Sequence, residues 1–391
     1  MDAVALYNLS PALRLMGMGL AVALGPLAWL WLRHRGAAPA AQLRALTLLT
    51  LFLTFDLVLF GAFTRLTDSG LGCPDWPGCY GHMSPVGARD HIEAAQSAMP
   101  TGPVTHGKAW VEMVHRYLAT GVGVLIIVLC LATWLQWRRG RRAAGAVPTA
   151  VSPGWPLLTL LWVIAQGAFG ALTVTMKLFP AIVTLHLLGG VGLLVLLTMQ
   201  AERYRQAGDA GAAETLGRGL RALLWLTTVA VGVQLALGGW VSTNYAVLAC
   251  SGFPTCQGSW WPPMDFAQGF ELWRPLGEQG DGGLLSFAAL TAIHYTHRLF
   301  AYLVFALLLA LVWGLHRAGA LSRQRRALLG LALLQFVTGL SNVVLGWPLL
   351  AAVVHTGGAA ALMTVLVWAL CASRAAARQP TSAGRPAGVH A

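Results

Sequence analysis

The chain has 391 residues, of which 57% are hydrophobic and only 10% are charged. A soluble domain carries about 25% charged residues, so this chain lacks the polar surface that a soluble protein needs. The formal net charge of +12 would suit a nucleic-acid partner, but the basic residues fall in short clusters between apolar runs. The composition therefore predicts an all-α integral membrane protein and argues against binding of nucleic acid.

Nine apolar runs are long enough to cross a bilayer as helices, because a span needs about 20 apolar residues. In chain order these runs are 13–32, 45–66, 111–136, 155–178, 180–201, 221–244, 289–315, 327–346 and 348–372. The fourth and fifth runs meet at Pro180 and the last two meet at Pro348, which predicts two tight hairpins. The first run carries no clear small-residue cleavage site, and we interpret it as a retained helix rather than a signal peptide.

Arginine clusters lie at alternate ends of consecutive spans, and the positive-inside rule predicts that this side is cytoplasmic. The clusters are Arg33, Arg35 and Arg44; Arg138, Arg139, Arg141 and Arg142; Arg203, Arg205, Arg218 and Arg221; Arg317, Arg323, Arg325 and Arg326; and Arg374, Arg378 and Arg385. The long loops 67–110 and 245–288 then face outward. Each contains two cysteines at the same spacing, in "GLGCPDWPGCYG" and "CSGFPTC", on the side where disulfides persist.

The chain also repeats itself at long period. "VEMVHRYLATGVGVL" resembles "AIHYTHRLFAYLVFAL", and "AQGAFGALTVTMKLFPAIVTLH" resembles "LQFVTGLSNVVLGWPLLAAVVH". We predict two pseudo-symmetric four-helix halves, 45–201 and 221–372, related by an axis near the membrane normal. An extra N-terminal helix with a cytoplasmic loop (1–44), a cytoplasmic linker (202–220) and a cytoplasmic tail (373–391) complete the predicted organisation.

Four histidines lie inside predicted spans that run inward from the outer side. At a rise of about 1.5 Å per residue, all four lie at similar depth near the outer face. An intramembrane histidine is costly without a partner, and a hydrogen bond to a neighbouring helix is the simple explanation for one of them. Their pairing by the repeat favours two metal sites, each with two axial imidazoles, which suit haem better than zinc. The four are His115, His186, His297 and His355.

Residues near these histidines leave alternatives open. Arg116 and Arg298 directly follow two of the histidines, where they could pair with haem propionates or extend to the membrane interface. Glycines that follow the other two histidines would allow either a flat macrocycle to approach the helix or close packing between helices. These glycines are Gly189, Gly190, Gly357 and Gly358.

Taken together, the motifs resemble the haem A synthase family. The resemblance covers roughly 45–372 and is carried by "FTRLTDSGLGCPDWPGC", "EMVHR", "HYTHR", "TLH", "VVH" and the two cysteine pairs. It implies a membrane oxidoreductase that converts haem O to haem A by oxidising the C8 methyl group to a formyl group, for use in cytochrome c oxidase. The family core has eight spans, so the first run departs from it.

The resemblance also implies a role for each half. His115 and His186 would flank the substrate haem, and His297 and His355 would hold the iron of a haem b cofactor. The implied location is the bacterial inner membrane, with the cysteine loops on the periplasmic face. Haem O would come from haem O synthase, the other contacts would be with membrane lipid, and the resemblance leaves a homo-oligomer open.

The two halves differ at one position that matters for chemistry. Glu112 stands three residues before His115, on the same helix face, whereas His294 occupies the corresponding position before His297. A carboxylate at the haem edge could accept protons as the methyl group is oxidised, and the resemblance implies this catalytic role. The alternative is a solvated glutamate at a helix start, where the helix dipole favours negative charge.

The resemblance and the shared outer location predict disulfides Cys73–Cys79 and Cys250–Cys256. The first would fold its loop over the outer end of the bundle and cover the substrate haem. It could act as a structural staple, or as an exposed redox relay whose short loop makes it easily reduced. The second is expected to be structural.

Two other function classes share part of this pattern. A dihaem b-type electron-transfer cytochrome would also need two bis-histidine sites, but it would not need Glu112 in one half only. A transporter with parallel repeats would predict broken helices and charged residues at the membrane midplane, where Asp56 is the one acid deep in a span.

Overall fold

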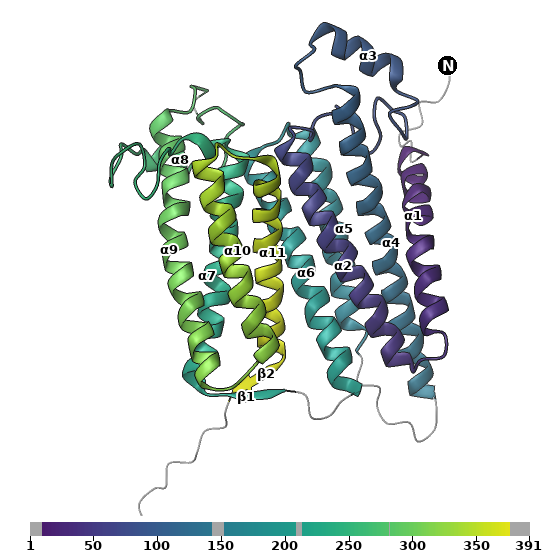
Figure 1. The fold of residues 1–391 in the computed structure, drawn as a ribbon. Helices are drawn as coiled ribbons and strands as arrows, with labels where there is room; N and C mark the ends of the chain where they lie inside the picture. The colour runs from purple at the N-terminus through teal and green to yellow at the C-terminus, as the bar shows by residue number, and fades with distance from the viewer. Residues whose placement is uncertain (1–9, 143–151, 209–212, 281, 376–391) are drawn as a thin grey trace, which may run out of the picture.

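The computed structural model describes residues 10–142, 152–208, 213–280 and 282–375. Within this part of the chain, nine helices are long and apolar enough to cross a membrane, which confirms the predicted spans (Figure 1). They are α1 (Ser10–His34), α2 (Pro39–Leu66), α4 (His106–Arg142), α5 (Gly154–Thr175), α6 (Pro180–Gly208), α7 (Arg218–Thr243), α9 (Phe287–Arg317), α10 (Ser322–Val344) and α11 (Leu349–Cys371).

The two predicted hairpins are present. The turn between α5 and α6 contains Lys177 and Leu178, and the turn between α10 and α11 contains Gly346 and Trp347, all with positive φ. In both turns the proline stands at the start of the second helix. A backbone N–H at that position would have no partner in the helix, so the proline costs no hydrogen bond there. The spans run from end to end without interruption, contrary to the broken helices expected of a transporter.

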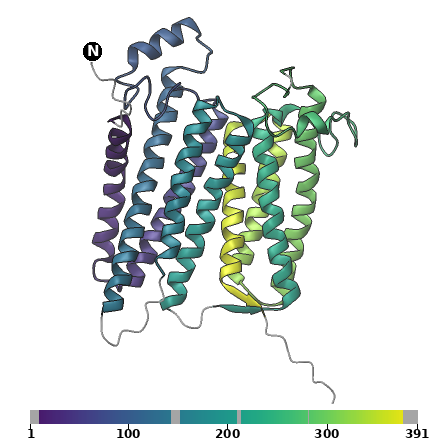
Figure 2. The same cartoon turned by 180° about the vertical axis from the view of Figure 1, so that it is seen from behind.

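The spans form two four-helix units that stand side by side (Figures 1 and 2). In the first unit α2 packs on α4, α4 on α5, α5 on α6 and α6 on α2. In the second unit α7, α9, α10 and α11 pack in the same cyclic order. The diagonal pairs, α4 with α6 and α9 with α11, therefore face each other across the interior of each unit.

The two units join through α2, α6, α7 and α11. Gly357 of α11 lies where a Cβ atom would collide with Leu59 of α2, so the helices approach closely there. At the loop end, Arg65 donates to the carbonyl of Ser242 at 2.6 Å, and Tyr245 donates to Asp68 at 2.6 Å. Burial raises the pKa of the Tyr245 phenol, which keeps it a neutral donor.

Elements between the spans lie at the two ends of the bundle (Figure 1). One end carries both cysteine loops, with α3 (Arg89–Ala98), a 3₁₀ turn at Ala246–Leu248 and the short α8 (Phe266–Gly269). At the other end β1 (Glu214–Leu216) pairs in parallel with β2 (Ser373–Ala375). The predicted linker and tail thus contribute a two-stranded sheet, which the hydropathy pattern did not indicate.

Helix α1 packs along α4 at the edge of the first unit, outside the eight-helix arrangement (Figure 2). The contact depends on the absence of a side chain at Gly19. A Cβ atom there would lie 2.4 Å from Cγ2 of Thr120 and 2.8 Å from its backbone carbonyl carbon. By contrast, a Cβ atom at Gly17 would meet nothing within 4 Å.

This difference predicts the result of a matched pair of substitutions. Gly19→Val should push α1 away from α4 and destabilise the protein by about 1–3 kcal/mol, as overpacking of a tight contact usually does. Gly17→Val makes the same chemical change on the same helix without the collision, and should have little effect. Thermal unfolding of both variants in detergent micelles measures the difference, and equal midpoints would show that α1 does not depend on this contact.

Candidate functional site

The four intramembrane histidines lie on the diagonal helices of the two units. His115 is on α4 and His186 on α6, whereas His297 is on α9 and His355 on α11. Because these helices are diagonal in each unit, the first two histidines share the interior of one unit and the other two share the interior of the second. The structure therefore brings the four together as two pairs, one inside each four-helix unit.

Each imidazole lies against a glycine of the neighbouring helix. A Cβ atom added to Gly61 would lie 3.1 Å from Cε1 of His115, and one added to Gly170 would lie 3.4 Å from Cε1 of His186. In the other unit, a Cβ atom added to Gly238 would lie 2.9 Å from Cε1 of His297, and one added to Gly339 would lie 3.1 Å from Cε1 of His355. A Cβ atom at Gly61, Gly238 or Gly339 would crowd the ring, whereas the separation at Gly170 is that of an ordinary van der Waals contact.

Sequence reasoning missed these glycines, although a signal was present. Gly61 and Gly238 stand at the same distance before the first cysteine of each pair, and Gly170 and Gly339 at the same distance before His186 and His355. Aligning the two halves residue by residue would have found them. The repeat thus preserves both the histidines and the space beside them.

The arrangement fits haem, which needs only two axial ligands from the protein. Among the described residues no group of three or more histidine, cysteine, aspartate or glutamate side chains could hold a metal ion by itself. Nδ1 of His115 and Nδ1 of His186 are buried and have no hydrogen-bond partner within the part of the chain that the structure describes. Such unpaired polar atoms are costly in an apolar interior. The fit to haem comes from the two histidines that each unit places on facing helices.

Glu112 is buried, with 4% of its surface exposed, so the alternative of a solvated glutamate is wrong. Its Oε1 pairs with the guanidinium of Arg116, and its Oε2 accepts a hydrogen bond of 2.8 Å from the backbone N–H of Cys73. The carboxylate therefore connects α4 to the first cysteine loop. At the corresponding position, Nδ1 of His294 lies 3.0 Å from the carbonyl oxygen of Ala246.

Arg116 and Arg298 play the same part in the two units. Arg116 is buried and donates to the backbone carbonyls of Asp75, Pro77 and Gly78 in the first cysteine loop. Arg298 is also buried and donates to the carbonyls of Cys250, Gly252 and Thr255, at 2.8–2.9 Å. Each guanidinium is directed to loop carbonyls and holds a cysteine loop against its bundle. Propionate binding by these arginines stays a prediction.

Both predicted disulfides are present, Cys73–Cys79 and Cys250–Cys256. All four cysteines are at most 1% exposed. The exposed sulfur that a redox relay would need is therefore absent from the first pair. Burial of the bond beneath its own loop favours the structural staple.

The glycines that follow His186 and His355 serve helix packing. A Cβ atom at Gly189 would collide with Gln166, and one at Gly358 would collide with Gln335. Gln335 is the counterpart of Gln166 in the repeat. Gln335 also donates to the backbone carbonyl of His355 at 2.9 Å. Of the two alternatives for these glycines, the structure supports close packing between helices.

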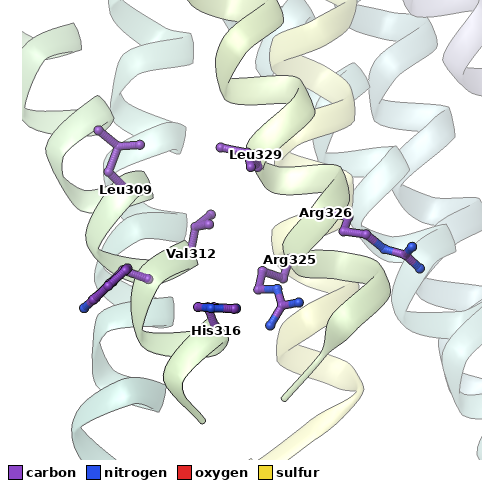
Figure 3. Close-up of a pocket in the computed structure, with 7 residues that line it drawn as sticks. Leu309, Val312, His316, Arg325, Arg326 and Leu329 are labelled. Carbon is purple, nitrogen blue, oxygen red and sulfur yellow. The ribbon is translucent and has the colours of Figure 1, made fainter. Parts of the chain in front are cut away.

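A groove of about 550 Å³ lies between α9 and α10 at the end opposite the cysteine loops (Figure 3). Leu309, Val312 and Leu329 form its apolar part, and His316 and Arg325 lie at its polar end. It does not include any of the four intramembrane histidines. Its mixture of apolar and basic side chains is typical of a helix end at a membrane interface.

Comparisons with known proteins agree with this geometry. The model of the COX15-CtaA family, described as cytochrome oxidase assembly protein, matches residues 44–367. A heme A synthase of Shewanella oneidensis is 41% identical over 330 residues, covering 83% of this chain and 95% of that protein. A heme A synthase of Alkalihalophilus pseudofirmus is 26% identical over 312 residues, covering 77% of this chain and 87% of that protein.

The matched region contains all four histidines, Glu112 and both cysteine loops, and begins after α1. These similarities do not support the alternative of a dihaem electron-transfer cytochrome. The chain has two pairs of buried histidines, each ring lying against a glycine, inside duplicated four-helix units. Because the family model matches most of its length, the chain belongs to the COX15-CtaA family of cytochrome oxidase assembly proteins.

Proposed function

We propose that this chain is a haem A synthase that oxidises the C8 methyl group of haem O to a formyl group, yielding haem A for cytochrome c oxidase. The family match and the relatives named heme A synthase support the proposal. The observation that carries it is the duplicated pair of buried imidazoles, each lying against a glycine. Two such pairs provide one position for a substrate haem and one for a cofactor haem.

In this proposal His115 and His186 hold haem O, while His297 and His355 hold haem b. The second pair has polar side chains beside its Nδ1 atoms, as metal-bound histidines usually do. The first pair lies in the unit that contains Glu112, whose place in the second unit is taken by His294. Bound between His297 and His355, haem b would supply one-electron redox chemistry.

Glu112 is assigned the role of proton acceptor during oxidation of the methyl group. It lies one helical turn from His115 on the same face of α4, toward the loop end. Arg116 provides a fixed counter-charge, and the Cys73 N–H holds Oε2 in place. The cysteine loop, held down by Arg116, would exclude water from this end of the unit.

The proposed location is the bacterial inner membrane, with the cysteine loops in the periplasm. Basic residues support this orientation, because they gather in the last turn of α4 and of α9, at the end opposite those loops. Haem O, whose macrocycle is largely apolar apart from its propionates, would reach the first unit through the membrane from the haem O synthase that makes it.

The first prediction concerns the cofactor ligands. His297→Ala or His355→Ala should abolish the spectrum of reduced low-spin haem b, because each removes one of its two axial ligands. His115→Ala should leave that spectrum in place. Optical spectra of the purified, dithionite-reduced variants make the comparison, and an unchanged b-type spectrum in either of the first two would refute the pairing.

A second prediction concerns Glu112. Glutamine keeps its size and one oxygen but cannot accept a proton, so Glu112→Gln should lower haem A formation by about 10²–10⁴ in rate. Haem b should stay bound, and haem O or a hydroxymethyl intermediate should accumulate. Chromatography of extracted haems at equal expression measures these products.

The matched control for Glu112→Gln is His294→Gln, which makes a change at the corresponding position of the other unit. It should leave the haem A yield close to that of the wild type. Non-reducing mass mapping of Cys73–Cys79 in both variants reports whether the loop has kept its structure. A normal haem A yield from Glu112→Gln would exclude the catalytic role and leave the carboxylate as a structural link.

The third prediction tests orientation. Ala94 on α3 and Ser322 at the start of α10 are exposed at opposite ends of the bundle. In intact spheroplasts a membrane-impermeant maleimide should label the Ala94→Cys variant, but should label Ser322→Cys only after the membrane is permeabilised. The reverse pattern would overturn the proposed topology.

A further inference from the structure

We propose that Gln234 and Thr338 are positioning residues that orient His297 and His355 for the iron of a resident haem, and that the first unit lacks their counterparts so that its haem can exchange. The inference rests on the proposed function, because it assigns the resident haem to the second unit. It adds a physical reason why one site keeps its haem while the other must release a product.

Thr338 shows how the orientation is achieved. Its hydroxyl donates to the carbonyl of Leu334 at 2.7 Å, so its proton is already used within α10. Its oxygen lies 2.9 Å from Nδ1 of His355 and is left as an acceptor. Nδ1 of His355 must then carry the proton, which leaves the lone pair of Nε2 free to bind a metal. The contact thus selects the ring tautomer that can act as an iron ligand.

Gln234 occupies the corresponding place beside His297. Its Nε2 lies 3.1 Å from Nδ1 of His297 and 3.1 Å from the backbone carbonyl oxygen of the same residue. Its Oε1 is buried and has no partner. The amide nitrogen also lies 3.5 Å from Nε2 of His297. If the amide turned so that its nitrogen left the His297 carbonyl and its oxygen faced Nδ1, that oxygen would accept the proton that an iron-bound imidazole carries there. The unpaired oxygen is therefore a reserved acceptor for the liganded state.

The first unit has no such groups at the matching positions. Leu57 stands four residues before Gly61, as Gln234 does before Gly238, and Phe169 precedes Gly170 as Thr338 precedes Gly339. Both replacements are apolar and cannot accept a hydrogen bond. This is consistent with the lack of any partner at Nδ1 of His115 and of His186. Their rings also lie against glycines, but no described side chain bonds to Nδ1 and fixes the ring tautomer.

The energetic consequence follows from the behaviour of metal-bound histidines. A hydrogen bond from Nδ1–H fixes the ring and makes the imidazole a better electron donor, and loss of such a partner typically costs about 10–100-fold in metal affinity. The second unit should therefore bind its haem more tightly and at a lower reduction potential. The first unit, without these contacts, is suited to accept haem O and release haem A.

The test uses the full-length protein purified with its haem b, and the variants Thr338→Val and Gln234→Leu. Each should lose haem b to excess apomyoglobin about 10–100-fold faster than the wild type. The midpoint potential of the remaining haem b should rise, since a weaker donor stabilises the oxidised iron less. Thr338→Ser keeps the hydroxyl and should restore both properties, which a purely steric role for Thr338 would not predict.

Haem transfer and midpoint potentials at the wild-type values in both Thr338→Val and Gln234→Leu would overturn the inference. Failure of the proposed function would look different, because the b-type spectrum would then survive His297→Ala and His355→Ala. The reverse exchange gives an independent measurement: Leu57→Gln together with Phe169→Thr should slow the release of haem from the first unit. An unchanged release rate in that double variant would also count against the inference.

Discussion

A polar group inside a membrane-spanning bundle must find its partner in the protein, because lipid offers none. This constraint explains the arrangement around the four imidazoles. Each ring occupies space left by a glycine on the adjacent helix, and each unit places its two rings on diagonal helices. The helices of one unit can therefore enclose two imidazoles without separating.

The same constraint accounts for the loops above the two units. A buried arginine one residue after a histidine would be costly, yet Arg116 and Arg298 each satisfy several loop carbonyls. The disulfide shortens the loop, and the arginine pulls its carbonyls onto the end of the bundle. The histidine-bearing helix and the loop that covers it are thus one structural unit, and it occurs twice.

Duplication supplied the scaffold, and a few substitutions gave its copies different properties. Glu112 takes a place that His294 occupies in the second unit, and it links Arg116 to the backbone of Cys73. Gln234 and Thr338 stand where the first unit has Leu57 and Phe169. In the proposed function, these three substitutions are among the differences that separate a reacting site from a site that only holds a haem.

Much of this protein could be predicted from its sequence. Apolar runs of bilayer length determine the spans, since hydrophobicity is a local property, and the repeat placed His115, His186, His297 and His355 in two equivalent pairs. The cysteine spacing and its outer location predicted both disulfides correctly. The burial of Glu112 was not predicted, because its position near a helix start is compatible with a solvated side chain until the loop above it is placed.

Tertiary structure decided the contacts between segments far apart in the chain. Only the packed helices show that Gly61 and Gly339 leave space for imidazoles while Gly189 and Gly358 accommodate glutamines. Only the folded loop shows that Arg116 and Arg298 satisfy backbone carbonyls, and only the approach of α10 to α11 places Thr338 beside Nδ1 of His355. Composition and periodicity determine which segments enter the membrane, but the partner of each buried polar atom depends on how the helices are arranged around it.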